Sequence, residues 1–284
     1  MTSYEVRQRL ELAEWNASVC FDYARGKQEE AEVATKTDSG AHTTFVTNVD
    51  REVESMCVQS IRGAFPDDEI VGEEGTGHEI RERRFTWVID PIDGTKSYTR
   101  GLPHWAVSIA VLAGGQTAAA AIAVSNGVYA ATRGDGGVKR NGVPFARRAR
   151  TSGKNLCLAL ESFEWLPKGA ELWWQLTKIV GSPWAFGSAV ATCALVLDGA
   201  LDAYLHPGLA LWDHAAVALL LKEAGLRLCR WDGSDPFPGI WDRVRSDPKN
   251  YLDRVYRFDL LAATSEAAKK LLPFLAPHAG WMER

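Results

Sequence analysis

Two carboxylates and a Gly-Thr turn directly follow an apolar stretch in residues 88–98, which read VIDPIDGTKSY. Asp90 and Asp93 repel each other at this spacing unless something positive lies between them. Pro91 restricts the backbone and has no N–H group, and Gly94 lets the backbone approach an anion closely. We interpret the segment as one that supplies oxygen ligands to Mg²⁺ and backbone N–H groups to a phosphate.

Further acids stand at the ends of predicted elements rather than on solvated faces. These acids are Asp50, Glu73, Glu74 and Asp213. Carboxylates at element ends often form a site on a rigid scaffold. The sequence contains neither a histidine pair at zinc spacing nor a cysteine cluster, which favours a hard cation such as Mg²⁺ over a soft metal.

Each of these signals also has a purely structural interpretation. The DPIDGT segment alone is equally typical of an Asp-rich turn, and GEE alone is typical of a surface turn. Asp50 and Asp213 alone are ordinary charges at helix N-termini. An EF-hand is disfavoured because the Asp spacing fails and no Glu closes a twelve-residue loop. The occurrence of all four signals in one chain favours a metal site.

The composition is that of a globular protein with an ordinary core. The chain has 284 residues, 46% hydrophobic and 24% charged, so we expect one large domain or two closely packed ones. The net charge of −4 argues against a nucleic-acid partner. The N-terminus lacks a signal-peptide pattern, and no apolar run reaches the ~18 residues of a membrane helix. Five dispersed cysteines indicate reduced core thiols, so we expect a cytoplasmic protein without a membrane partner.

Hydrophobic spacing in the first half predicts helices at residues 4–28 and, capped by Asn48, at 48–64. Between them, residues 26–44 lack periodicity, and we expect a loop or flap. The predicted strands are 69–72, 85–90, 105–112, 117–124 and 127–132, followed by a hairpin at 140–145. Residues 1–150 therefore form an N-terminal α+β half with antiparallel character, which carries most of the acids.

From residue 151 the helix and strand patterns alternate. The predicted elements are a helix at 170–180, a helix, turn and strand within 187–205, a helix at 212–224, strands at 226–231 and 259–264, and a helix at 265–275. Residues 232–255 are loop-like. We expect residues 151–284 to form an α/β half that carries Asp213 and the residues that determine substrate specificity.

Three segments together resemble the inositol monophosphatase family of Mg²⁺-dependent, lithium-sensitive phosphatases. They are WVIDPIDGTKSY, GEEG before it and LWDHAAVALLLKEAG after it, in the family's order and spacing. The resemblance runs from about Glu5 to Leu272. It implies a layered α-β-α-β-α sandwich of the inositol monophosphatase and fructose-1,6-bisphosphatase type. It also implies a homodimer that hydrolyses a small-molecule phosphate monoester with two or three Mg²⁺ ions.

The resemblance implies a role for each residue that matches the family's motifs. Implied metal ligands are Glu73, Asp90, the Ile92 carbonyl, Asp93 and Asp213. Asp50 and Thr95, with Glu73, resemble the group that orients and deprotonates the attacking water. Implied substrate contacts are Asp93, Gly94, Thr95, Gly187, Ser188, His206 and Asp213. Lys36 resembles the family's flap lysine, although the flap is a few residues longer than usual.

His206 stands where many family members have a glutamate that hydrogen-bonds a substrate hydroxyl or amine. An imidazole donates or accepts a hydrogen bond but brings no fixed negative charge, which weakens the case for an amine-bearing substrate. The alternative is that the His206 ring simply points to solvent beside Pro207.

The substrate stays open at this point. DGTKSYTRG resembles histidinol-phosphate phosphatases and, in part, 3'(2'),5'-bisphosphate nucleotidases, whereas WAVSIAV and GSAVATC resemble inositol phosphatases. A polyol, cyclitol or sugar phosphate, histidinol phosphate and a bisphosphate nucleotide are therefore all candidates. The non-enzyme alternative is a regulatory binding partner with the same fold, which the presence of all the implied ligands disfavours.

Overall fold

The computed structural model describes residues 2–37, 43–76, 83–148, 155–161, 169–181, 183–237, 246 and 258–280. The described helices are α1 Ser3–Lys27, α2 Asn48–Ala64, α3 Thr95–Tyr98, α4 Gly169–Leu176, α5 Ala189–Leu197, α6 Leu211–Glu223 and α9 Ser265–Leu275, with 3₁₀ turns η1 Gln28–Glu30 and η2 Ala276–His278. The described strands are β1 Val33–Thr37, β2 Thr43–Thr47, β3 Glu69–Gly72, β4 Phe85–Asp93, β5 Ala106–Ala113, β6 Gln116–Val124, β7 Gly127–Thr132, β8 Lys139–Arg140, β9 Val143–Pro144, β10 Leu158–Leu160, β11 Ala203–Leu209, β12 Arg227–Cys229 and β13 Phe258–Ala263.

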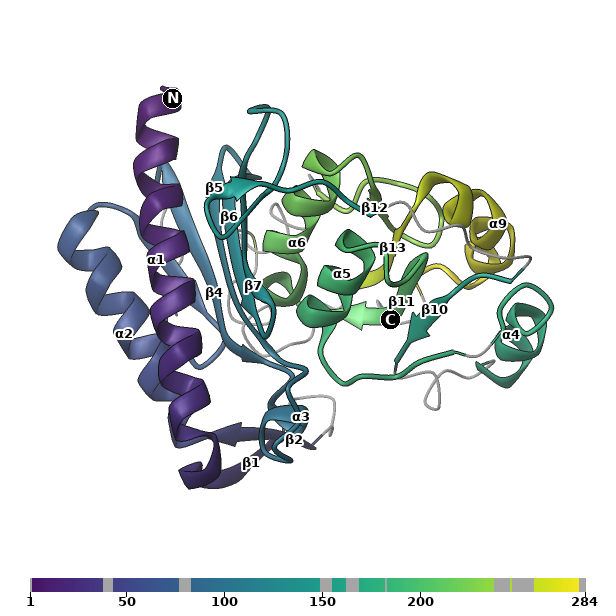
Figure 1. The fold of residues 1–284 in the computed structure, drawn as a ribbon, viewed down its shortest axis with the longest axis horizontal. Coiled ribbons are helices and arrows are strands. Elements are labelled where there is room, and N and C mark those ends of the chain that lie inside the picture. The colour runs from purple at the N-terminus through teal and green to yellow at the C-terminus, as the bar shows by residue number, and fades with distance from the viewer. Residues whose placement is uncertain are drawn as a thin grey trace.

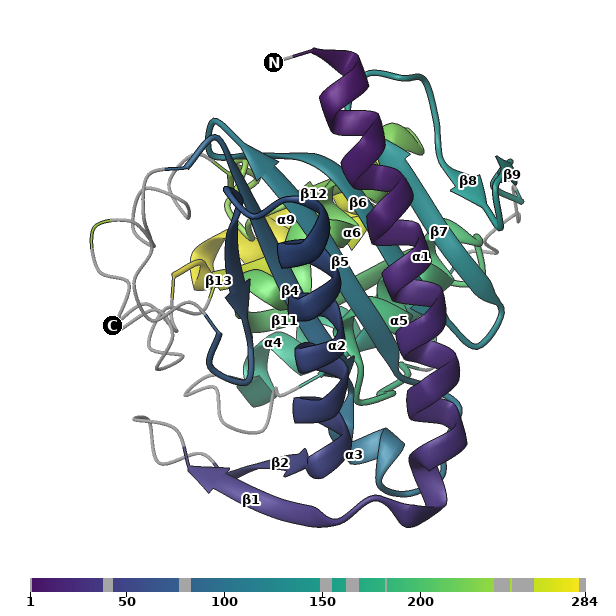
Figure 2. The same ribbon diagram turned by 90° about the vertical axis from the view of Figure 1, so that its left-hand side faces the viewer.

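Helices and sheets alternate in layers across the molecule (Figure 1). Helices α1 and α2 cover one face of a seven-stranded sheet of order β3-β4-β5-β6-β7-β8-β9, as Figure 2 shows from that side. Helices α5 and α6 pack against its other face and also against a four-stranded sheet of order β10-β11-β13-β12. Helices α4 and α9 form the outermost layer. The predicted α-β-α-β-α sandwich is thereby confirmed.

Strand β4 carries the candidate site, and it is buried along its whole length. It pairs in parallel with β3 and antiparallel with β5. The pairing with β5 runs regularly to Asp90 opposite Ser108, is interrupted, and resumes at Asp93 opposite Ala106. Pro91 has no N–H group to donate to the ladder, so a bulge is expected there. The irregularity re-aims the two aspartates at the end of the strand.

For residues 26–44 we predicted a loop or flap, and the loop is wrong where β1 and β2 lie. These two strands pair as an antiparallel hairpin with Val33 opposite Thr47. A short hairpin of β-branched and polar residues has no helical period, which is why the pattern was missed. The predicted cap Asn48 is also wrong by one residue. Thr47 caps α2 instead, because its Oγ1 accepts the N–H of Asp50 at 3.3 Å.

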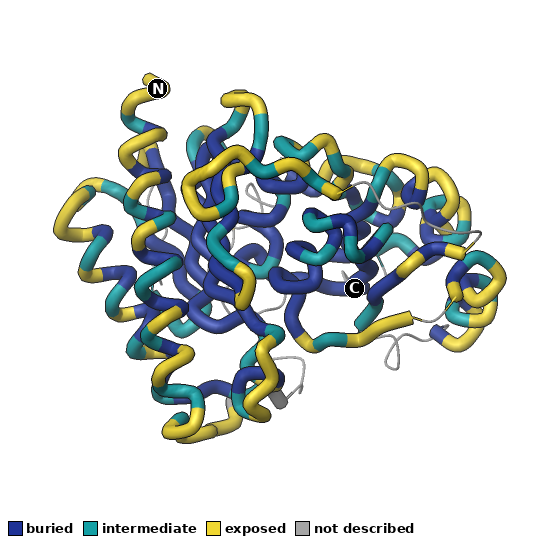
Figure 3. Tube along the Cα trace, in the orientation of Figure 1, coloured by how far each residue is buried: buried dark blue, intermediate teal, exposed yellow. Residues whose placement is uncertain are grey.

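Buried residues, dark blue in Figure 3, form three apolar clusters. The first lies between helices α1 and α2 and the seven-stranded sheet, and the second surrounds α5 and α6 between the two sheets. The third lies between the four-stranded sheet and helices α4 and α9. Cys20, Cys57, Cys193 and Cys229 lie within these clusters as free thiols. The predicted core location is wrong for Cys157, which is exposed. None of the described helices is long and apolar enough to cross a membrane. The division of the chain at residue 150 stays a prediction.

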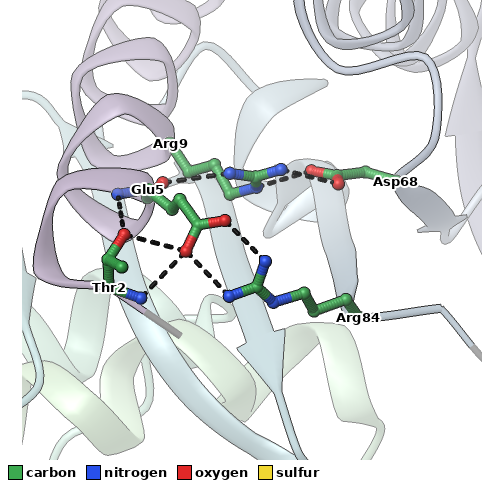
Figure 4. A network of polar contacts seen from close by, with 5 residues as sticks. All are labelled: Thr2, Glu5, Arg9, Asp68 and Arg84. Carbon is green, nitrogen blue, oxygen red and sulfur yellow. Dashed lines mark hydrogen bonds and ion pairs between the residues drawn. The ribbon is translucent and has the colours of Figure 1, made fainter.

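A polar network fastens α1 to the edge of the seven-stranded sheet (Figure 4). Arg9 donates from Nε and Nη2 to the two carboxylate oxygens of Asp68, at 2.7 and 2.8 Å. Glu5, which also completes the capping box with Thr2, accepts two hydrogen bonds from Arg84. The Arg9–Asp68 pair is almost fully buried, so removing one partner would leave the other charge buried and without its counter-charge.

Candidate active site

Three acids meet where β4 ends and α6 begins. One carboxylate oxygen from each of Asp90, Asp93 and Asp213 lies within 4.8 Å of the other two. Asp90 is 1% exposed and Asp93 is 7% exposed, whereas Asp213 is partly accessible. The bulge at Pro91 is what allows two acids from one strand to reach the same point. The structure therefore brings together three of the predicted metal ligands.

Asp90 is the most deeply buried of the three acids. Among the described residues, neither Oδ1 nor Oδ2 of Asp90 accepts a hydrogen bond. Burial raises the pKa of Asp90 well above its usual range, and the negative charges of Asp93 and Asp213 raise it further. A buried carboxylate is ordinarily hydrogen-bonded or bound to a metal. Orphaned hard oxygens in a group of acids fit Mg²⁺, which prefers carboxylate ligands.

Asp93 is held in place by the first turn of α5. It accepts hydrogen bonds from the Ser188 hydroxyl, from the N–H of Val190 at 2.8 Å and from the N–H of Ala189 at 3.2 Å. Burial raises the pKa of Asp93, and these hydrogen bonds lower it. Ser188 was predicted to contact the substrate. Its hydroxyl is instead directed at Asp93, and Ser188 is not among the described residues that line the pocket.

Asp50 and Asp213 are positioned by the same kind of local hydrogen bond. Each is the third residue of its helix and reaches back to the chain before the helix. Asp50 Oδ2 accepts the N–H of Thr47 at 2.8 Å, and Asp213 Oδ2 accepts the N–H of Ala210 at 2.8 Å. The positive end of each helix stabilises the carboxylate at that position. Sequence pattern locates such acids well because the hydrogen bond is local.

Thr95 links Asp50 to the end of β4. Its Oγ1 lies 3.3 Å from Asp50 Oδ1 and 3.1 Å from the Ile92 carbonyl oxygen, and it can donate to either. Asp50 is fully buried. The predicted Asp50–Thr95 pair is therefore within hydrogen-bond reach, with the Thr95 side of the pair facing the pocket.

Gly94 is required for the turn between β4 and α3. Its φ is +90°, and a Cβ at this position would lie 2.6 Å from Ser188 Cβ. The turn therefore packs directly against the start of α5. Thr95 begins α3, whose first N–H groups have no partner within the helix.

The Glu73 loop is held by Glu54, a residue that the sequence reasoning missed. Glu54 of α2 accepts the N–H of Glu74 at 2.8 Å, and the N–H and hydroxyl of Thr76 at 3.1 and 2.7 Å. Burial raises the pKa of Glu54, and these hydrogen bonds lower it. Glu73 itself lines the pocket, although it is not one of the three acids grouped within 4.8 Å. Nothing in the local pattern distinguishes Glu54 from a surface glutamate.

A pocket of about 200 Å³ contains these groups. The predicted residues that line it are Glu73, Asp90, Ile92, Asp93, Gly94, Thr95, Gly187, His206 and Asp213. Phe45 of β2 also lines it, so the β1–β2 hairpin reaches the site. Lys36 lies on β1 opposite Thr44, but its side chain falls outside what the structure describes.

The opposite wall of the pocket comes from the four-stranded sheet. His206 is 8% exposed and lines the pocket, so the alternative that its ring points to solvent is wrong. Its Nδ1 accepts the N–H of Gly208 at 3.0 Å. The sequence reasoning missed Glu161, which follows β10 and lines the pocket beside His206. An acid directly after the apolar LCLAL stretch was the available signal, but β10 had not been predicted.

Comparisons with known proteins agree with this geometry. A family model described as "Inositol monophosphatase family" matches residues 6–275. A relative named putative Nus factor SuhB, from Neisseria meningitidis, is 34% identical over 76% of this chain and 85% of its own length. The structure of the Thermotoga maritima IMPase aligns with a TM-score of 0.77 at 21% identity, over 95% of this chain and 97% of that one.

A third comparison concerns bound ligands. The structure of SaIMPase-II bound to inositol monophosphate aligns with a TM-score of 0.73 at 23% identity, over 98% of this chain and 95% of that one. Another structure of the same protein holds 2'-AMP. At these identities the likeness establishes the fold and leaves the substrate of this chain to its own residues.

Proposed function

The chain belongs to the inositol monophosphatase family, and from this premise we propose that it is a Mg²⁺-dependent phosphomonoesterase acting on a small polyol, cyclitol or sugar phosphate. The observation that carries the proposal is Asp90, a buried carboxylate whose oxygens have no hydrogen-bond partner among the described residues and which lies beside two further acids. The negative charges of these three acids repel one another in the protein alone, and a divalent cation bound between them would relieve that repulsion.

The residues that would hold Mg²⁺ are Glu73, Asp90, the Ile92 carbonyl, Asp93 and Asp213. When bound, the metal would supply Lewis acidity to a water molecule and to the phosphate oxygens. Asp93 is fixed by α5 and Glu73 by the loop that Glu54 holds, so these carboxylates are oriented before any ligand arrives. Gly94 and Thr95 would offer backbone N–H groups to the phosphate.

Thr95 and Asp50 would handle the proton of the attacking water. Thr95 Oγ1 donates toward Asp50 Oδ1 at 3.3 Å, which leaves the Thr95 oxygen as an acceptor toward the pocket. A proton taken by Thr95 Oγ1 can therefore be compensated by transfer from Thr95 to Asp50. General-base assistance of this kind typically contributes about 10²–10⁴ in rate.

Phosphate release by purified protein, with Mg²⁺ and with EDTA, tests the proposal. The panel is inositol 1-phosphate, histidinol phosphate, 3'-phosphoadenosine 5'-phosphate and several sugar phosphates. Mg²⁺-dependent release from a polyol, cyclitol or sugar phosphate is the expected result. Absence of release from every ester, with protein that unfolds cooperatively, would overturn the proposal.

A regulatory binding role is the second candidate, and it rests on the relatives that are named Nus factors. For this chain we propose a small phosphate ester as the ligand and a homodimer as the assembly. We propose no nucleic-acid partner, because the net charge is −4. Complementation of a deletion strain separates the two roles. A binding role would survive Asp90→Asn, whereas an enzymatic role would be lost with it.

A further inference from the structure

Glu161 directly follows β10, and it lies beside His206, which is in the middle of β11. The two strands are parallel, with Leu160 opposite Leu205, and the N–H of Glu161 donates to the Leu205 carbonyl at 3.3 Å. Glu161 therefore lies level with His206 on the neighbouring strand. Both residues line the same pocket as the acids of β4.

The Glu161 carboxylate is held rigidly through one of its oxygens. Oε1 accepts the N–H of Gly187 at 2.7 Å and the N–H of Phe186 at 3.1 Å. Phe186 is itself fixed, because its ring stacks on Trp184 and its carbonyl accepts the Ser97 hydroxyl at 2.9 Å. The segment 184–187 thus orients Glu161, as a site residue requires.

The other oxygen, Oε2, differs from Oε1 in its contacts. Among the described residues, no group donates a hydrogen bond to Oε2, although Glu161 lies in the wall of the pocket. Burial raises the pKa of Glu161 to about 7. The hydrogen bonds of this carboxyl group are therefore complete at Oε1 only, and a ligand in the pocket could donate one to Oε2.

His206 supplies the complementary donor. Its Nδ1 accepts the N–H of Gly208, so in the neutral ring the proton is on Nε2. An acceptor and a donor on adjacent strands match an alcohol, which both donates and accepts. An ammonium group only donates, so it would satisfy Glu161 but would oppose the Nε2–H group of His206.

We propose that Glu161 Oε2, with His206 beside it, binds hydroxyl groups of the alcohol part of the substrate and so selects polyol or cyclitol esters over hydroxyl-free and amine-bearing ones. This inference rests on the proposed function for its reaction, but the binding preference can be measured without turnover. Glu161 is a specificity-determining residue in this account and takes no part in the hydrolysis itself.

The test compares inositol 1-phosphate with cyclohexyl phosphate, which has the same ring without hydroxyl groups, and with histidinol phosphate. Wild type is expected to prefer inositol 1-phosphate over both in kcat/KM. Glu161→Gln keeps an oxygen for the two backbone N–H groups but places an amide NH₂ at the open position. It should lower the preference for inositol 1-phosphate over cyclohexyl phosphate at least about tenfold, and change cyclohexyl phosphate less than about twofold.

Two further variants keep the test decisive. Glu223→Gln is the matched control, because Glu223 accepts the N–H of Gly134 at 2.9 Å outside the residues that line this pocket, and its selectivity should equal that of wild type. Glu161→Ala should lose the same preference as Glu161→Gln if both variants fold. An equal loss for both esters in Glu161→Gln would overturn the inference.

Binding separates failure of this inference from failure of the proposed function. If wild type hydrolyses no ester, the proposed function fails, and the dissociation constants of the same three esters with Mg²⁺ decide the inference instead. A wild-type preference for inositol 1-phosphate that falls about tenfold in Glu161→Gln supports it. No wild-type binding of inositol 1-phosphate, or tighter binding of histidinol phosphate, overturns it.

Discussion

Asp90 is a buried acid and Glu161 a partly buried one, on opposite walls of one pocket, and they differ in their hydrogen-bond partners. Both have a pKa that burial raises. Glu161 is anchored by two backbone N–H groups, whereas Asp90 has no hydrogen-bond partner among the described residues. The wall formed by β4 and α6 thus carries acids whose mutual repulsion a cation would relieve, whereas the carboxylate on the wall formed by β10 and β11 has backbone donors of its own. We propose the first wall for the reaction and the second for contacts with the alcohol part of the substrate.

The largest effect should follow from Asp90→Asn. Because Asp90 accepts no hydrogen bond from the described residues that an amide would break, the variant should fold, yet it lacks a negatively charged metal ligand. We predict a loss of at least about 10³ in kcat/KM with Mg²⁺, together with an unfolding free energy in EDTA that is equal to or about 1–3 kcal/mol above that of wild type. Phosphate release and urea denaturation measure the two quantities.

Asp259→Asn is the matched control for a buried aspartate that has partners. Asp259 lies on β13 and accepts the N–H groups of Trp231 at 3.1 Å and of Gly280 at 2.5 Å, and its Oδ1 is 3.4 Å from Nε of Arg230. The substitution should cost about 1–3 kcal/mol of stability and leave kcat within about twofold. If Asp90→Asn behaves like Asp259→Asn, with lost stability and retained activity, the contrast between the two walls is wrong.

Thr95→Val should have the next largest effect, because it removes the hydroxyl that connects the pocket to Asp50. We predict a fall of about 10²-fold or more in kcat with little change in KM. Thr99→Val is the control at the end of the same short helix, where the hydroxyl donates to the Lys96 carbonyl at 3.1 Å. Equal activity of the two variants would remove Thr95 from the proton pathway.

Glu54→Gln should have a smaller effect that reaches the site indirectly. One amide nitrogen would face the N–H groups of Glu74 or Thr76, and the loop that carries Glu73 would shift. We predict a reduction of about tenfold in kcat/KM and a higher Mg²⁺ concentration for half-maximal activity. A variant with normal Mg²⁺ dependence would show that Glu54 supports the fold alone.

The smallest effect concerns Glu161 and pH. Its folded-state pKa of about 7 lies above the ordinary value of 4.5, so the folded protein holds this proton more tightly than the unfolded chain. Wild type therefore loses the corresponding stability as the pH rises from about 4.5 through 7. Glu161→Gln does not titrate, so its stability relative to wild type should increase by about 1–3 kcal/mol between pH 5 and pH 8. Urea denaturation at both pH values, in EDTA, measures the difference, and a pH-independent difference would contradict the assignment.

The sequence located the acids of β4 and α6 well, because most of that wall of the pocket is encoded locally. Asp90, Ile92, Asp93, Gly94 and Thr95 are consecutive or nearly so, and together with the other acids at element ends their spacing favours a metal site. The acid at the start of α6 is fixed by a hydrogen bond to the residue just before its own helix. The layered sandwich was expected from the resemblance to the family, not from the element patterns, and the sheet topology confirms it.

The wall formed by β10 and β11 was predicted poorly because it depends on contacts that are distant in the sequence. Glu161 is oriented by the N–H groups of Phe186 and Gly187, and its neighbour His206 comes from a strand more than 40 residues later in the numbering. Ser188 matched a substrate contact by position, but the hydroxyl bonds to Asp93, a contact between α5 and β4 that no local pattern contains.

Calorimetric titration of wild type and Asp90→Asn with Mg²⁺, in the presence of inorganic phosphate, tests the central claim most directly. The claim is that the acids of β4 and α6 form a cation site on which the hydrolysis depends. Wild type is predicted to bind Mg²⁺ in the same concentration range that supports phosphate release, and Asp90→Asn to show neither binding in that range nor release. Unchanged Mg²⁺ binding by Asp90→Asn, or phosphate release by wild type in EDTA, would contradict the claim.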